Sequence, residues 1–319
     1  PSAIAEHFNN FFINIANVTP NNICVQNIPP INHSLSYEIS HNFTCPLATE
    51  DEICMIINNL KCSSAIDIYG MSNNFIKMHG KALTSSLTKL ININLRDGTF
   101  PDALKVGVVT PIYKTGDRKN KNNYRPITVN PIVGKVFEYV IQRRLQDHLD
   151  SNNIINCNQF GFVKNSNAEV ATAHILHDIY NGIDNKKAVS LTCIDLSKAF
   201  DSIRHDILIN KLKSLQFDKT FIKLLISYLE DRKQATKISN IISSFKIIKA
   251  GTPQGGILSN PFFNLYINDI FNIGIVGKLA LYADDMSLTN VADNPQELKN
   301  MMDHDLDQIS KWLNLNQLT

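Results

Sequence analysis

The sequence predicts an α+β fold in which an antiparallel sheet packs on helices. Short β-branched and apolar runs predict strands, and longer segments between them repeat apolar residues at the 3.6-residue spacing of a helix. The strand runs that carry acidic residues lie far apart in the chain, which favours a sheet assembled from distant segments. With 319 residues, the chain is long enough to bury a large core or to form two subdomains.

The N-terminal part is predicted to contain two helices separated by an irregular segment. Apolar residues recur at helical spacing over residues 3–15, which predicts an amphipathic helix. Residues 18–48 contain four prolines and little periodicity, so we expect a long loop or linker there. Thr49 and Glu52 have the spacing of a capping box, which predicts a helix that begins there and runs to Leu60.

The rest of the chain alternates between helical and extended patterns. Helices are predicted over residues 81–95, 131–149, 167–183, 205–215 and 218–229, and a last helix begins at Pro295. Strands are predicted from Lys105 onward and over residues 235–238 and 245–248. The last helix is expected to turn one apolar side inward, made of Leu298, Met302, Leu306, Ile309, Trp312 and Leu313.

Two adjacent acids, Asp284 and Asp285, are the most informative feature of the sequence. They lie between apolar runs at residues 278–281 and 286–288, a pattern that predicts a strand, a tight turn and a second strand. Two unit charges about 4 Å apart repel by roughly 4 kcal/mol at an effective dielectric near 20, so such a pair favours a bound cation. Carboxylate oxygens are ligands that suit Mg²⁺. The alternative is a chance pair of acids at a surface turn.

A third acid and a glycine-rich turn lie upstream. Asp195 ends an apolar run that includes Cys193, which we expect to be a small buried residue. A strand that brings Asp195 beside the hairpin would complete a three-carboxylate site for two metal ions, although Asp195 could instead cap the next helix. The Gly/Pro turn at residues 251–256 precedes an apolar helix that begins near Ile257. Glycines there allow close approach of a ligand, and a helix N-terminus favours phosphate.

Charge and cysteine content narrow the classes of protein only slightly. The net charge is +2, so a nucleic-acid partner must be argued from local charge. One basic loop is either a solvated hairpin tip or a phosphate-facing surface. It contains Lys114, Arg118, Lys119, Lys121 and Arg125. The six cysteines and nine histidines form no zinc-binding spacing, and the cysteines are expected to be free thiols of an intracellular protein. No apolar run approaches the length of a membrane span.

The order of the three elements resembles motifs A, B and C of reverse transcriptases. An acid-bearing strand is followed by the Gly-Gln turn with its helix and then by the Asp-Asp hairpin. The resemblance is closest to the non-LTR retrotransposon group, the jockey-like and long interspersed elements, and it covers the chain from about Glu50 onward. Further blocks follow in the family's order at residues 103–114, 123–127, 159–162, 199–201, 228–234 and 265–270.

The resemblance implies a right-hand polymerase architecture of fingers and palm, with the antiparallel sheet in the palm and no thumb subdomain in this chain. It implies an N-terminal helical extension over residues 1–98, with the loop at 18–48, and a reverse transcriptase domain over residues 99–319. Within that domain, the fingers would cover about 99–187 and the palm about 188–319, with helices of the two interleaved.

The resemblance also implies roles for single residues. Asp195, Asp284 and Asp285 would hold two Mg²⁺ ions, with Mn²⁺ as a substitute, and would be catalytic. Phe200 would block the sugar 2′-position and select deoxynucleotides, unless it is an ordinary core residue. Gln254 and Gly255 would contact the incoming nucleotide, and Lys114 and Arg125 would grip its triphosphate. Tyr282 would pack beneath the primer end, or it is simple core.

The implied activity is RNA-directed DNA polymerisation, a nucleotidyl transfer from a deoxynucleoside triphosphate to a primer 3′-hydroxyl. The implied partners are an RNA template, a DNA primer and deoxynucleotides, with no membrane. An endonuclease and a thumb are expected elsewhere in the parent element, and the nucleus and cytoplasm are the expected compartments. One alternative is a catalytically inactive, truncated or domesticated reverse-transcriptase-like domain that binds RNA. Another is an organellar intron-encoded reverse transcriptase.

Overall fold

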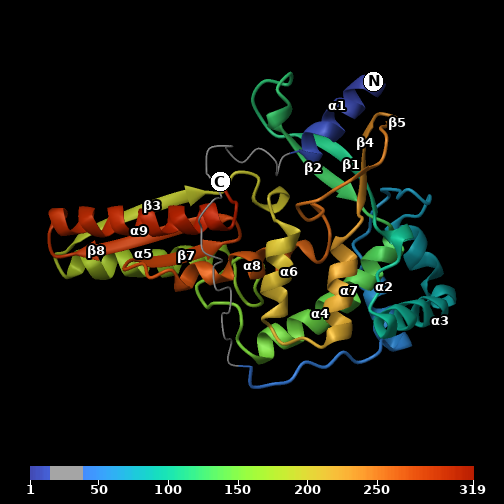
Figure 1. Cartoon of the computed structure of the whole chain (residues 1–319), viewed down its shortest axis with the longest axis horizontal. Coiled ribbons are helices and arrows are strands. Elements are labelled where there is room, and N and C mark those ends of the chain that lie inside the picture. The colour runs from blue at the N-terminus through green and yellow to red at the C-terminus, as the bar shows by residue number, and fades with distance from the viewer. Residues whose placement is uncertain (15–38) are drawn as a thin grey trace.

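The computed structural model of the chain describes residues 1–14 and 39–319 and has two sheets among its helices (Figure 1). The first sheet has the order β2-β1-β4-β5, and β6 also pairs with β4. Its strands are β1 (Val106–Tyr113), β2 (Tyr124–Val129), β4 (Lys233–Ile238), β5 (Ile241–Ile242) and β6 (Lys246–Ile247). The pairs are antiparallel except β1 with β4, which is parallel. The mixture of sheets and helices confirms the predicted α+β class.

The second sheet is antiparallel and lies between two helices. Its order is β3 (Ala188–Asp195), β8 (Asp285–Ala292) and β7 (Lys278–Tyr282). One face packs on α5 (Ala168–Asp184) and the other on α9 (Pro295–Leu315), and Figure 1 shows these elements together at one end of the molecule.

Side-chain contacts fix which helix covers which face of this sheet. Ala171 of α5 packs with Ala280 of β7, which lies opposite Ser287 of β8. On α9, the Asp305 carboxylate accepts a hydrogen bond from Asn290 Nδ2 at 2.6 Å. Because Ser287 and Asn290 are three residues apart on one strand, their side chains lie on opposite faces. The two helices therefore enclose the sheet on both sides.

A helical body holds the main hydrophobic core. Buried aromatic side chains from distant segments meet there, and the ring of Phe100 stacks on that of Phe137 with centroids 5.1 Å apart. Its helices are α2 (Glu50–Asn59), α3 (Asn73–Asp97), α4 (Ile132–Ser151), α6 (His205–Lys213), α7 (Lys219–Leu229) and α8 (Ser259–Ile267). Short 3₁₀ turns are η2 (Asp102–Leu104), η3 (Lys121–Asn123), η4 (Ala199–Asp201) and η5 (Asn268–Asn272). Within the two described ranges, no helix is long and apolar enough to cross a membrane.

The N-terminal helix α1 (Ser2–Ile13) lies against the first sheet, as Figure 1 shows. Buried Asn9 donates a hydrogen bond to the Ser244 carbonyl at 2.9 Å. The buried Phe12 ring packs on Val109 of β1, and the Phe8 ring meets Tyr124 of β2 edge-on at 5.0 Å. These contacts show why the apolar residues predicted at helical spacing fall on one side of α1.

Most predicted elements are confirmed, with two corrections. Helix α3 begins at residue 73 rather than 81, because Ser72 Oγ caps it by accepting from Phe75 N at 3.1 Å. The capping box at α2 is only half formed: Thr49 Oγ1 accepts from Glu52 N at 3.1 Å, but the Glu52 carboxylate pairs with Arg144. Most of the loop predicted over residues 18–48 lies outside the described residues.

Candidate active site

Three carboxylates lie at one end of the second sheet. Asp195 is the last residue of β3 and lies opposite Asp285, the first residue of β8. Asp284 occupies the two-residue turn that joins β7 to β8. The sheet register thus brings Asp195 to a pair of acids that begins 89 positions later in the chain, 284 minus 195. The alternative that Asp195 caps the next helix is wrong, because Lys198 precedes the 3₁₀ turn η4 as its cap.

The electrostatics of the hairpin indicate that the three acids interact. Burial raises the pKa of the Asp284 carboxyl, the charges of Asp285 and Asp195 raise it further, and the Arg125 guanidinium lowers it. Among the residues that the structure describes, no three His, Cys, Asp or Glu side chains are arranged closely enough to hold a metal ion by themselves. The donor set of three carboxylates nevertheless has the hard oxygen chemistry that suits Mg²⁺.

The Gln159-Phe160-Gly161-Phe162 segment is hydrogen-bonded to the β7–β8 hairpin. Gln159 Oε1 accepts hydrogen bonds from Gly161 N at 2.8 Å and from Ala283 N at 3.2 Å. Phe160 N donates to the Leu281 carbonyl at 2.7 Å. Ala283 has a φ of +56°, so the turn that carries Asp284 is held in a left-handed conformation. The position of the acids therefore depends on this segment, a role that its sequence did not reveal.

A cavity of about 610 Å³ opens in front of the carboxylates. It is bounded by β3, the β7–β8 hairpin, strand β2 and the glycine-rich turn. Of the predicted site residues, only Tyr282 is absent from its lining. The others line it: Lys114, Arg125, Asp195, Phe200, Gln254, Gly255, Asp284 and Asp285. Tyr282 lies opposite Asp285 and is 38% exposed, so the alternative that it is simple core is wrong.

The glycine-rich turn is tied to the segment that follows β3. Gly251 N donates to the Ile203 carbonyl at 2.7 Å, and Thr252 N donates to the Phe200 carbonyl at 3.0 Å. On its other side, the Gln254 carbonyl accepts from Thr128 N of β2 at 2.9 Å. The turn therefore links the two sheets at the cavity.

The helix after this turn, α8, begins at Ser259 rather than near Ile257. Just before it, Ile257 N donates to the carboxylate of Glu138, a fully buried residue of α4, at 2.7 Å. Burial raises the pKa of the Glu138 carboxyl, whereas the nearby Arg232 charge and the bonds from Ile257 N and Leu258 N lower it. An internal acid thus takes the N–H of Ile257, while Ser259 and Asn260 in the first turn of α8 line the cavity.

Comparison with known proteins identifies the family. The family described as "Reverse transcriptase (RNA-dependent DNA polymerase)" matches residues 113–319. This chain belongs to the reverse transcriptase family. It is 28% identical over 270 residues to the "Probable RNA-directed DNA polymerase from transposon BS" of Drosophila melanogaster, covering 82% of this chain and 30% of that protein. It is 26% identical over 308 residues to the "RNA-directed DNA polymerase from mobile element jockey" of the same species, covering 93% and 33%.

These relatives confirm the resemblance to the non-LTR retrotransposon group. This reverse transcriptase chain spans no more than about a third of the length of either relative. Among solved structures, it is similar to the apo telomerase of Candida tropicalis truncated from its C-terminal domain. The TM-score is 0.50 at 13% sequence identity, over 69% of this chain and 50% of that one. That similarity supports the fold alone.

Phe200 of this reverse transcriptase is fixed in place by two other aromatic rings. Its ring stacks on Phe263 of α8 with centroids 4.5 Å apart, and Phe162 meets it edge-on at 6.0 Å. The side chain is half-buried and lines the cavity. One side of the Phe200 ring therefore packs on the core and the opposite side bounds the cavity. The prediction of a core residue and the prediction of a residue that blocks the sugar 2′-position are thus compatible.

The basic loop divides into cations at the cavity and cations on aromatic rings. Lys114 and Arg125 line the cavity. Arg118 lies over the Tyr113 ring at 5.0 Å, and Lys121 lies over the Phe11 ring of α1 at 4.7 Å. Lys114 and Arg125 thus present charge to the cavity, whereas Arg118 and Lys121 are held on aromatic rings.

The prediction that Cys193 is buried is wrong, because its side chain is exposed. Strand β3 lies at the edge of its sheet, and Cys193 is two residues before Asp195, so both side chains lie on the same face. In this reverse transcriptase, that face is open near the carboxylates. The cysteines in the described part of the chain are all free, as predicted.

Cation binding at the hairpin is expected to weaken as the pH falls, and to do so at a higher pH than for an ordinary aspartate. A cation requires ionised carboxylates, and the raised pKa of Asp284 means that its carboxyl takes up a proton earlier on acidification. Calorimetric titration with Mg²⁺ between roughly pH 8 and pH 5 measures this effect. The variant Asp284→Asn should bind Mg²⁺ more weakly and with a shallower pH dependence. Equal affinity of the parent chain across that range would contradict the expectation.

Proposed function

We propose that this chain is the fingers and palm of an RNA-directed DNA polymerase of a non-LTR retrotransposon. The observation that supports it best is the cavity, because three carboxylates share its wall with Phe200, Gln254 and two cationic side chains. In this proposal, residues 1–98 form an N-terminal extension and residues 99–319 the reverse transcriptase domain. The fingers cover about 99–187 and the palm about 188–319, with β4 to β6 returning to the sheet of the fingers.

The proposed reaction is attack of a primer 3′-hydroxyl on the α-phosphate of a deoxynucleoside triphosphate. Asp195, Asp284 and Asp285 would hold two Mg²⁺ ions. Bound there, the ions would supply a lower pKa for the primer hydroxyl and positive charge to neutralise the departing pyrophosphate. The protein's own contribution is to align the reactants and to supply fixed charge.

Other residues of the cavity orient the substrates. Lys114 offers a point charge and Arg125 a two-pronged donor to the triphosphate, and both line the cavity that the acids face. Gln254 and Gly255 contact the incoming nucleotide from the glycine-rich turn. Tyr282, exposed beside Asp285, supports the end of the primer.

The proposed substrates are an RNA template, a DNA primer and deoxynucleotides. An endonuclease and a thumb subdomain would be supplied by other parts of the parent protein. The share of the relatives that this chain spans, 30% and 33% for two of them, leaves room for such parts.

Primer extension tests the proposed function. The chain is incubated with an RNA template, an annealed DNA primer, deoxynucleotides and Mg²⁺, and is compared with Asp284→Ala. Primer extension that is lost in the variant and on chelation of the metal supports the proposal. Binding of RNA without primer extension, by a chain whose thermal unfolding is cooperative, would support the inactive RNA-binding alternative instead.

Replacing Phe200 by alanine is expected to weaken the discrimination against ribonucleotides. The ring is held by Phe263, so it cannot move aside for a 2′-hydroxyl, whereas a methyl group leaves that volume open. The ratio of kcat/KM for deoxynucleotide over ribonucleotide should fall about 10- to 100-fold. Phe245→Ala, which removes an exposed ring outside the cavity, serves as the matched control. An unchanged ratio in Phe200→Ala would remove the role assigned to this ring.

A further inference from the structure

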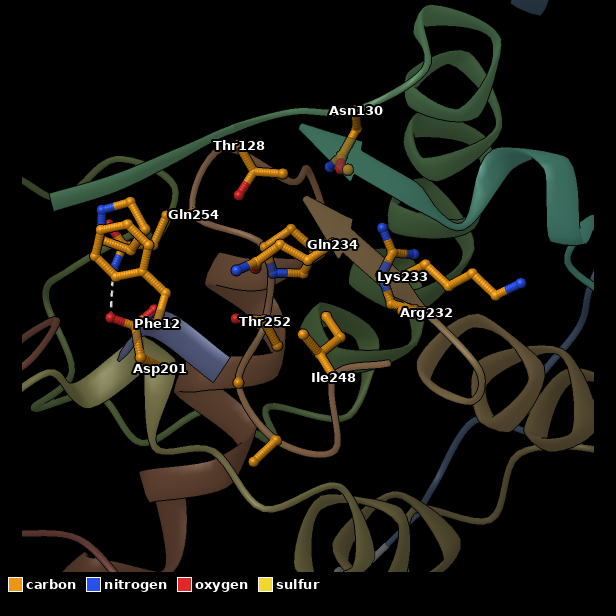
Figure 2. Close-up of a pocket in the computed structure, with 15 residues that line it drawn as sticks. Phe12, Thr128, Asn130, Asp201, Arg232, Lys233, Gln234, Ile248, Thr252 and Gln254 are labelled. Atoms are coloured by element: carbon orange, nitrogen blue, oxygen red, sulfur yellow. Dashed lines mark hydrogen bonds between the residues drawn. The ribbon is translucent and has the colours of Figure 1, made fainter. Parts of the chain in front are cut away.

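Asp201 and Gln254 form a direct contact between the turn after β3 and the glycine-rich turn. Gln254 Nε2 donates to Asp201 Oδ2 at 2.8 Å, and Figure 2 draws this bond as a dashed line. Both residues line the large cavity with the three carboxylates. Both also line a second, smaller cavity of about 30 Å³, together with Phe12 of α1 (Figure 2). The pair therefore belongs to the linings of both spaces.

The backbone around the pair leaves little room for it to move. Gly251 has a φ of +80°, and a Cβ at that position would lie 2.9 Å from the Asp201 carbonyl oxygen. The Gln254 main chain is fixed in turn by the bond from Thr128 N of β2. With both backbones held, the hydrogen bond decides where the Gln254 side chain points.

The charge state of Asp201 decides how the Gln254 amide is oriented. Burial raises the pKa of the Asp201 carboxyl to about 6, while the bond from Gln254 and the Lys198 charge act in the opposite direction. Above that pH the carboxylate can only accept hydrogen bonds, so Gln254 must turn its Nε2 toward it. The amide oxygen and the second N–H of Gln254 then remain for a ligand in the cavity.

We propose that Asp201 is a positioning residue that fixes the orientation of the Gln254 amide toward the incoming nucleotide. The inference rests on the proposed polymerase function and adds a residue to it. Partly burying a carboxylate costs stability, as the raised pKa of Asp201 indicates, so Asp201 is a poor choice for packing alone. An asparagine would fill the same volume without the charge, but it could face Gln254 with either its oxygen or its nitrogen.

The variant Asp201→Asn separates positioning from packing. We expect kcat/KM for deoxynucleotide incorporation to fall about tenfold, mainly through a higher KM, as for a lost hydrogen bond to a charged group. The melting temperature at about pH 8 should be unchanged or higher, because a poorly solvated charge is removed. In a Gln254→Ala background the same change should have little further effect. Asp206→Asn, which alters an exposed acid on the neighbouring helix α6, is the control and should match the parent chain.

A second readout does not depend on catalysis. The side-chain amide signal of Gln254 in a ¹⁵N-labelled sample, assigned by its loss in Gln254→Ala, should shift with a midpoint near pH 6 in the parent chain and should not shift in Asp201→Asn. Unchanged kinetics in Asp201→Asn, or equal losses with and without Gln254, would overturn the inference while the polymerase function stands. If the Gln254 amide signal titrates but the folded chain extends no primer, the proposed polymerase function is overturned. The role of Asp201 in nucleotide placement is then overturned as well.

Discussion

Asp195→Asn is expected to lower primer extension by about a thousandfold or more without unfolding the chain. Asp195 lies at the exposed end of β3, opposite Asp285, and its charge raises the pKa of Asp284. The amide has nearly the same shape, so the strand register is kept. Removing one of three like charges relieves repulsion in the absence of a cation, and the melting temperature should therefore be unchanged or slightly higher.

Single-turnover primer extension and thermal unfolding, measured on the same preparation, test this expectation. Asp303→Asn is a suitable control, because it makes the same chemical change at an exposed position of α9 away from the cavity. If the activity of Asp195→Asn were within tenfold of that of the parent chain, Asp195 would not hold a catalytic cation. A large drop in melting temperature would instead show that the carboxylate stabilises the end of the strand.

Gly161→Ala is expected to unfold or displace the hairpin that carries Asp284 and Asp285. A Cβ at Gly161 would lie 2.1 Å from Ala283 N and 2.8 Å from its Cα. Both partners are main-chain atoms, so no side chain can rotate away, and the turn must move. Severe overpacking of this kind costs about 3 kcal/mol of unfolding free energy. Because the acids follow Ala283 directly, polymerisation should be lost as well.

Gly134→Ala provides a matched control within the same chain. Gly134 lies in helix α4, and a Cβ added there would have Leu104 Cβ as its nearest neighbour, at an ordinary contact distance of 3.5 Å. Alanine at that position should stabilise the helix by about 0.5–1 kcal/mol or leave it unchanged. Chemical denaturation of both variants measures the contrast. A Gly161→Ala chain with the parent's stability and activity would show that the hairpin tolerates displacement of Ala283.

The residues that line the candidate site could be predicted from sequence because they lie in local patterns. Acids at strand ends and a Gly-Gln turn are visible as short motifs, and the structure brings Asp195, Gln254 and Asp284 to one cavity. Their supports could not be predicted. Gln159 reaches the hairpin across 124 positions, and Glu138 reaches Ile257 across 119, through single side chains whose partners no periodicity indicates. A side-chain-to-backbone bond leaves no pattern in the sequence of either partner.

The start of α3 and the burial of Cys193 were predicted wrongly because both depend on contacts with distant segments. The first two turns of α3 were missed because polar residues and Gly80 dilute the helical pattern there, while Gly80 fits closely against Ile57 of α2. Cys193 was expected to be buried because its neighbours are apolar. Cys193 lies instead on an edge strand, which has a neighbouring strand on one side only, and edge position depends on which strands pair, which a short run cannot reveal.

The parallel pairing of β1 with β4 also constrains how the chain is made. Val106 pairs with Lys233, and 127 residues separate them, 233 minus 106. At a synthesis rate of about 5–20 residues per second, β1 waits roughly 6 to 25 seconds on the ribosome for its second neighbour. During that time one side of β1 is an unpaired edge that can bind other chains. Strand β3 is synthesised within the same interval, so the first sheet closes only after Asp195 has left the ribosome. A nascent chain stalled before β4 should therefore bind chaperones and aggregate, whereas one stalled after β6 should resist both.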